Sequence, residues 1–107
     1  MANYLLAYRG GGMPESEEEG QKVMAAWMGW FGALGEAVVD GGNPCGASKS
    51  VASNGAITDG APSMVTGYSV LRADNLDAAT EMAKGCPILM TGGSVDVYET
   101  FDASEGM

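Results

Sequence analysis

The sequence predicts an α+β fold in which two helices cover one face of an antiparallel sheet. At 107 residues the chain is long enough for one domain with a modest core. Its apolar residues alternate along several short runs and recur at three- and four-residue spacing along two longer ones. The order is strand, helix, hairpin and strand, helix, strand. Segments in this order pack most simply in the ferredoxin-like layout.

The first strand and the first helix have clear signals. Residues 3–8, NYLLAY, are apolar on both alternating faces, which predicts a strand covered on two sides. Ser16 and Glu19 stand at the spacing of a capping box, so a helix begins there. An apolar stripe that is expected to lie on the sheet follows, formed by Val23, Trp27, Trp30, Leu34 and Val38.

A hairpin and a further strand occupy the middle of the chain. Asn54-Gly55 suits a type I′ turn, so residues 49–53 are expected to fold back on residues 56–58. Residues 64–71, MVTGYSVL, form the next predicted strand.

The second helix is bounded by strong start and stop signals. Asp74 or Asn75 supplies the cap, Gly85 follows the last turn, and Pro87 prevents continuation. Residues 94–100, SVDVYET, then alternate as a half-buried strand. We therefore expect a single domain over residues 1–100, followed by an acidic tail over residues 101–107.

Composition excludes several classes of function. Fourteen acidic and five basic residues give a net charge of -9, which disfavours nucleic acid and anionic membranes as partners. A basic leader and an apolar run of 18 residues are both missing, so we expect a cytoplasmic protein without a membrane span. Two cysteines and no histidine make a zinc site unexpected, and no cofactor is predicted. Acid-base chemistry would need a carboxylate, tyrosine, lysine or cysteine with a shifted pKa.

The sheet face away from the helices is expected to be apolar. The strand at 64–71 places Met64, Tyr68 and Val70 on one side and Val65 and Leu71 on the other. A face of this kind is rarely left in water, so we predict a homodimer whose two sheets face each other.

Several stretches in order resemble the YCII-related family, and particularly its DGPF branch. They are YLLAY, MAAWMGWFGALGEAVVDGG, the TDG turn, GYSVLRADNLDAATEMAKGCP and GGSVDVYE, which together cover nearly the whole chain. The resemblance implies a ferredoxin-like fold that dimerises into an α+β barrel. Some relatives are lyases or dehydrochlorinases of small ring compounds, and some are encoded beside sigma factors.

The family site pairs a histidine near the start of the first helix with the aspartate of the DG turn. Only the aspartate has a counterpart, Asp59, because residues 25–28 carry no ionisable side chain. The branch motif is also altered, since Ala61-Pro62-Ser63 follows Gly60.

Asp59 has two interpretations: a residue that simply favours turns, or a base or polar anchor in a pocket. Other candidate ligand-binding residues are Tyr4, Tyr8, Arg9, Trp27, Ser63 and Tyr68. The aromatic residues among them suit a core equally well, and Arg9 suits an exposed strand end.

The leading hypothesis is a small homodimer that binds a small molecule near Asp59, with weak or no catalysis. The alternatives are a lyase or isomerase of small cyclic compounds that uses Asp59 and a tyrosine, and a regulatory protein-interaction module.

Overall fold

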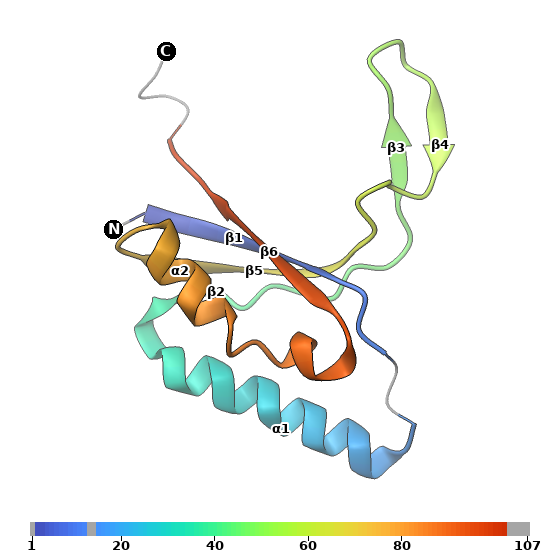
Figure 1. Cartoon of the computed structure of the whole chain (residues 1–107). Helices are drawn as coiled ribbons and strands as arrows, with labels where there is room; N and C mark the ends of the chain where they lie inside the picture. Colours follow the sequence, from blue (N-terminus) through green and yellow to red (C-terminus); the bar gives the residue numbers. More distant parts are fainter. Residues whose placement is uncertain (1, 13–14, 103–107) are drawn as a thin grey trace.

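A computed structural model describes residues 2–12 and 15–102 of the chain (Figure 1). The main sheet is antiparallel, and its strands lie in the order β2 (Val38–Asp40), β5 (Val65–Ala73), β1 (Ala2–Arg9) and β6 (Ser94–Glu99). The helices are α1 (Glu17–Leu34), α2 (Leu76–Ala83) and the short 3₁₀ turns η1 (Gly35–Ala37) and η2 (Pro87–Thr91). A separate two-stranded sheet consists of β3 (Lys49–Val51) and β4 (Ile57–Asp59).

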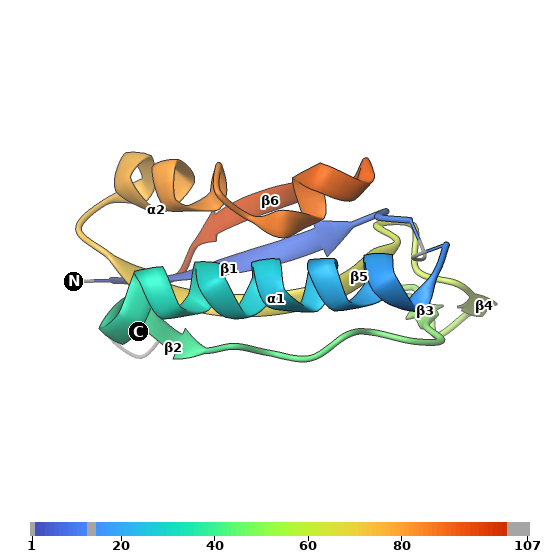
Figure 2. The ribbon, with the colours of Figure 1, turned by 90° about the horizontal axis from the view of Figure 1, so that it is seen from below.

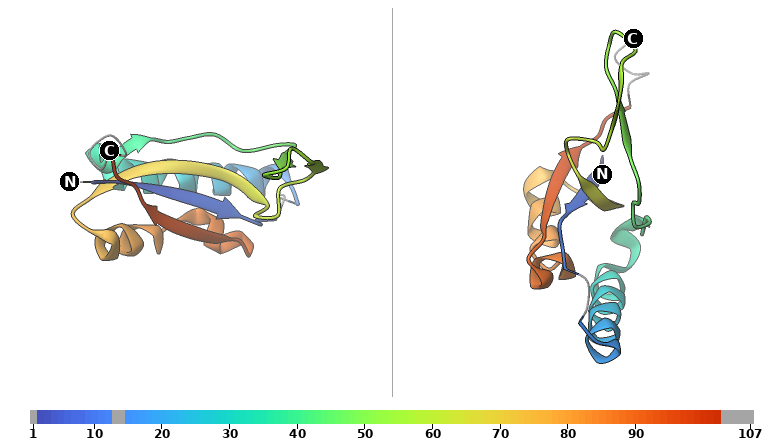
Figure 3. Two further views of the ribbon diagram at one scale, coloured as in Figure 1. Left: turned by 90° about the horizontal axis from the view of Figure 1, so that it is seen from above. Right: turned by 90° about the vertical axis from the view of Figure 1, so that its right-hand side faces the viewer.

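Both α-helices lie on the same face of the main sheet. Seen from below, α1 and α2 lie in front of the strands (Figure 2), and seen from above they lie behind them (Figure 3). The strand order and the one-sided helices confirm the ferredoxin-like α+β fold expected from the sequence.

The start of α1 follows the predicted capping signal, but its end does not follow the predicted stripe. The Ser16 hydroxyl accepts a hydrogen bond from the Glu19 amide at 3.2 Å. The helix ends at Leu34, because Gly35 takes a φ of +56° and η1 follows. Val38, expected as the last residue of the helical stripe, instead begins β2 and pairs with Leu71.

The edge of the main sheet beside β5 is continued by the segment that follows β2. After β2 the chain continues alongside β5, where Pro44 bridges Gly67 and the Cys45 amide donates to the Thr66 carbonyl at 3.0 Å. The predicted hairpin is present, with β3 paired to β4, and it forms a two-stranded sheet outside the main one.

The hairpin turn is also of another type than predicted. A type I′ turn needs a positive φ at both central residues, but only Gly55 of the pair has one, at +88°. The Gly55 amide donates to the Ala52 carbonyl, and the Ala52 amide donates to the Ala56 carbonyl. These bonds describe a three-residue loop with glycine in the left-handed region, a common hairpin connection.

The second helix begins at the predicted cap. The Asn75 side chain accepts from the Ala78 amide at 2.7 Å. Gly85 follows the helix for a reason that the sequence did not show: a β-carbon there would lie 3.2 Å from the Trp30 indole. That indole donates to the Met82 carbonyl at 3.1 Å and ties α1 to α2.

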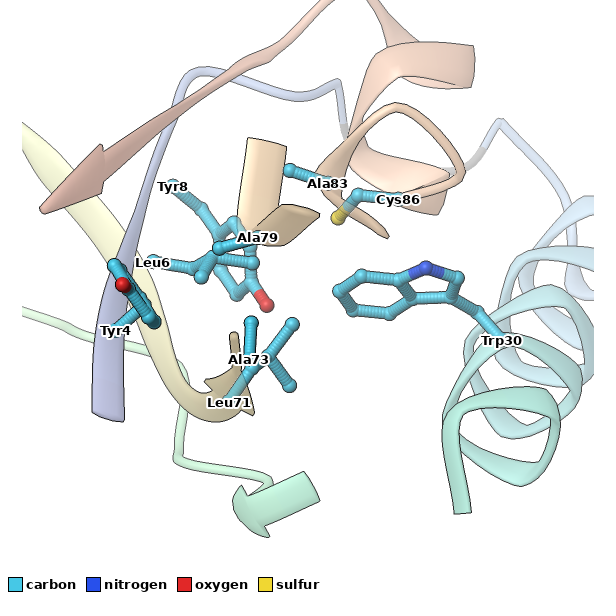
Figure 4. Packing of buried hydrophobic residues seen from close by; sticks show 9 residues of the cluster. All are labelled: Tyr4, Leu6, Tyr8, Trp30, Leu71, Ala73, Ala79, Ala83 and Cys86. Carbon is cyan, nitrogen blue, oxygen red and sulfur yellow. The ribbon is translucent and has the colours of Figure 1, made fainter. Parts of the chain in front are cut away.

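The core lies between the helices and the sheet. Figure 4 shows Trp30 projecting from α1 toward Cys86, with the strand side chains opposite. Its buried hydrophobic members are Tyr4, Leu6, Tyr8, Trp30, Leu71, Ala73, Ala79, Ala83 and Cys86. Of the predicted acidic tail, only Phe101 and Asp102 fall within the described residues.

Candidate ligand pocket

A pocket of about 330 Å³ opens between α1 and the sheet. It lies where the chain passes from β2 along β5, so strand, helix and connecting segment all contribute walls. The lining residues are Tyr8, Trp27, Phe31, Gly41, Gly42, Asn43, Pro44, Thr66, Gly67, Tyr68 and Ile88. The volume is that of a small-molecule site.

Aromatic rings form one wall of the pocket. The Trp27 ring centroid lies 5.1 Å from that of Tyr8, with the planes at 71°, and 5.8 Å from that of Phe31, with the planes at 36°. Trp27 and Phe31 are both on α1, four residues apart, which places them on the same side of the helix. Since each ring is held by its neighbours, this wall is prearranged for an apolar or planar ligand.

A chain of hydrogen bonds fixes Tyr8 beneath the pocket. The Tyr8 hydroxyl donates to the Ser69 hydroxyl at 2.6 Å, which donates to the Gly41 carbonyl at 2.7 Å. Burial raises the pKa of Tyr8 well above its ordinary value, and the nearby Cys86 adds to the increase, while the bond to Ser69 opposes it. The phenol therefore stays neutral near pH 7 and is a poor general base there.

The Gly41–Asn43 segment forms another part of the lining and requires glycine at its centre. Gly42 has a φ of +76°, and a β-carbon there would lie 1.6 Å from the Tyr68 carbonyl oxygen. The Tyr68 amide donates to the Asn43 carbonyl at 3.3 Å, which holds the segment against β5. Only glycine allows this close approach of two backbones.

The lining contains few ionisable groups. None of its eleven residues carries a carboxylate, an amine or a guanidinium group. Its polar groups include the Tyr8 hydroxyl, the Asn43 amide, the Thr66 hydroxyl and the backbone. The pocket thus offers ring stacking and a few hydrogen bonds, but no formally charged side chain.

The structure brings together three of the predicted site residues, Tyr8, Trp27 and Tyr68. Tyr4 does not line the pocket, because its side chain is buried in the core with 2% of its surface exposed. Arg9 lies on the open face of the sheet, where its Nε is 3.0 Å from an Asp96 carboxylate oxygen.

Asp59 lies outside this pocket in the single chain. It ends β4 on the projecting hairpin, where its side chain is 89% exposed and pairs with Lys49 across the two strands. Ser63 is also exposed, in the turn between Gly60 and β5. The role of Asp59 in catalysis stays a prediction.

Sequence reasoning missed Phe31, Asn43 and Ile88 as lining residues. Phe31 lies beside the predicted apolar stripe of the helix, and Ile88 belongs to a 3₁₀ turn without a clear sequence pattern. The available signal for Asn43 is the GGNP stretch at 41–44, because two glycines before an Asn-Pro pair are typical of a backbone that approaches another closely.

Fold and site together define an α+β protein of ferredoxin-like layout with an aromatic pocket between its first helix and its sheet. Across the described residues, no helix has both the length and the apolar character needed to cross a bilayer.

Comparison with solved structures identifies a protein of the same fold. It is 5-chloro-2-hydroxyhydroquinone dehydrochlorinase (TftG) from Burkholderia phenoliruptrix AC1100, in complex with 2,5-dihydroxybenzoquinone. The two structures agree with a TM-score of 0.57 and 17% sequence identity, over 96% of this chain and 97% of that one. No family model matches the chain, and no curated protein matches it by sequence.

Proposed function

We propose that this protein binds a small, uncharged ring compound in the pocket between α1 and the sheet, with weak or no catalysis. The observation that carries the proposal is the pairing of an ordered aromatic wall with a lining free of charged groups. An anionic ligand would find no cation among the lining residues and would also meet the repulsion of a chain with net charge -9. A neutral ring would lose little solvation and gain stacking against Trp27.

Tryptophan fluorescence can test the proposal, because the chain has two tryptophans and Trp27 lines the pocket. Hydroquinone serves as the neutral probe and benzoate as the anionic one. We expect hydroquinone to bind at least tenfold more tightly than benzoate. Calorimetry is expected to show at least a tenfold loss of hydroquinone affinity in Trp27→Ala.

The matched control is Met24→Ala, since Met24 lies one helical turn before Met28 on the exposed side of α1 and does not line this pocket. It should bind hydroquinone as the unaltered protein does. Equal affinity for the two probes, or binding that survives Trp27→Ala, would contradict the proposed site.

The assembly and the family also form part of the proposal. The ferredoxin-like fold and the sequence stretches that resemble the YCII-related family favour a cytoplasmic member of that family. This member would act as a homodimer. Its open sheet face supports this assembly, because Leu5, Val70 and Tyr98 share that face by the strand register and no helix within residues 2–12 and 15–102 covers it.

The dehydrochlorinase neighbour provides the reason to keep a catalytic alternative, a lyase or isomerase of small cyclic compounds. In that version Tyr8 replaces the family histidine as the base, which its raised pKa disfavours. If the protein turns over a cyclic substrate and the Asp59→Asn variant does not, the lyase or isomerase alternative is favoured. A protein that copurifies through the acidic surface would favour the regulatory alternative.

A further inference from the structure

The β3–β4 hairpin stands away from the main sheet, on the side opposite the helices. Figure 1 shows it rising from one end of the sheet while α1 lies below, and the right view of Figure 3 shows the same separation. Its direction is fixed at the base, where the Gly60 amide donates to the Ser48 carbonyl and the Ala61 amide donates to the Ser48 hydroxyl, both at 2.9 Å. The hairpin is therefore an ordered projection beside the open face.

This hairpin has no core of its own. Its strands contain three residues each, and Val51 and Ile57, which pair across them, are 69% and 64% exposed. Met64, just after its base, is also exposed. Since a two-stranded hairpin alone is at best marginally stable in water, these apolar side chains call for a covering surface.

The distribution of charge favours a second copy of the chain as the partner that covers these apolar side chains. The chain carries -9 overall, but three of its five cationic side chains lie on the open face or the hairpin: Arg9, Lys49 and Arg72. Two of them are neutralised locally, in the pairs Arg9–Asp96 and Lys49–Asp59. The charges named on this surface thus nearly cancel, while the acidic excess of the chain lies elsewhere, so a second copy meets less repulsion here than the net charge of -9 suggests.

Area and length favour the same occupant. Four strands of at most eight or nine residues give a sheet face of roughly 500 Å², whereas a standard interface needs about 800 Å² per partner. A hairpin of this length extends roughly 17 Å, farther than the ~10 Å between packed sheets. The hairpin would thus pass the plane of the partner's sheet and cover the edge of that sheet. This contact would add roughly the area by which the sheet face falls short of a standard interface.

The geometry points to an exchanged arm: the β3–β4 hairpin of each copy packs through Val51 and Ile57 against the second copy. This inference rests on the proposed homodimer and adds the segment that holds it together. Because a two-fold interface is self-complementary, the two arms are buried in equivalent positions.

Sedimentation at low micromolar concentration tests the arm, with circular dichroism to check folding. The unaltered protein is expected at about 22 kDa, twice the 10.9 kDa of one chain. Ile57→Asp and Val51→Asp should each weaken dimerisation at least tenfold. The matched control Met24→Asp adds the same charge to an exposed apolar residue of α1 and should leave the dimer intact.

Two outcomes would overturn different parts of the inference. If the unaltered protein is a monomer, the proposed homodimer fails. If it is a dimer that both hairpin variants leave unchanged, the arm fails and the dimer stands. Hydrogen exchange gives an independent measurement: the Ala52 amide, bonded to Ala56 at 2.8 Å, should be protected in the dimer and exposed in Ile57→Asp.

Discussion

The Tyr8 hydroxyl lies 2.6 Å from the Ser69 hydroxyl, although 61 residues separate them in the chain. This bond joins β1 to β5 at the pocket, and Ser69 continues it to the Gly41 carbonyl at the start of the Gly41–Asn43 segment. Both side chains are buried, so water cannot replace either partner. The bond connects the stability of the fold directly to the shape of the pocket.

Replacing Ser69 with alanine should therefore destabilise the protein more than replacing Tyr8 with phenylalanine. Ser69→Ala leaves the Tyr8 hydroxyl and the Gly41 carbonyl without their partner, at a cost of about 1–3 kcal/mol. Tyr8→Phe leaves the Ser69–Gly41 bond in place and should cost about 1 kcal/mol. Urea denaturation measures both values. The reverse order of the two losses would show that the bond network does not hold the pocket as described.

Stability should fall at alkaline pH through the same tyrosine. Burial raises the pKa of Tyr8 above 10.0, so the phenol loses its proton in the unfolded chain before it does so in the folded one. The stabilisation is complete below the unfolded pKa and is lost as pH rises through the folded pKa. We expect the free energy of unfolding to decline above about pH 10, and to decline less in Tyr8→Phe.

Cys86 requires a control in that experiment, because burial also raises its pKa from 9.0. Cys86→Ala removes the thiol contribution and should retain the tyrosine contribution. If the decline above pH 10 is the same in Tyr8→Phe as in the unaltered protein, Tyr8 is not its source.

Two glycine-to-alanine substitutions should have opposite effects. Gly42→Ala combines a positive φ with a clash against the Tyr68 carbonyl, and a loss of about 3 kcal/mol is expected. Gly29→Ala, on α1, meets no atom within 4 Å and should stabilise by about 0.5–1 kcal/mol. Thermal unfolding of both proteins measures the contrast. A Gly42→Ala protein of ordinary stability would mean that the wall at Gly42 can shift freely.

Asp59→Asn should leave hydroquinone affinity unchanged within about twofold, because Asp59 does not line the pocket of its own chain. The substitution weakens an ion pair with Lys49 that is exposed to solvent, so the stability change should stay below about 1 kcal/mol. Calorimetry and urea denaturation measure the two effects. A large loss of affinity would place the carboxylate in a site formed by two copies.

Much of this fold follows from local patterns in the sequence. Ser16 and Asn75 cap the two helices as expected, and the alternation at 94–99 predicts β6. These signals are readable because each depends on residues a few positions apart, whose side chains bond neighbouring amides or share one face of an element.

Only the tertiary structure decided where the hairpin and the pocket lie. A strand pattern does not state its partner, so the sequence could not show that 41–45 pairs with β5 while 49–59 leaves the sheet. Likewise, alternation places Tyr4 and Tyr8 on one face, and both are core residues, yet only Tyr8 also lines the pocket. Those outcomes depend on contacts between residues far apart in the chain, such as Tyr8 with Trp27, which local patterns do not encode.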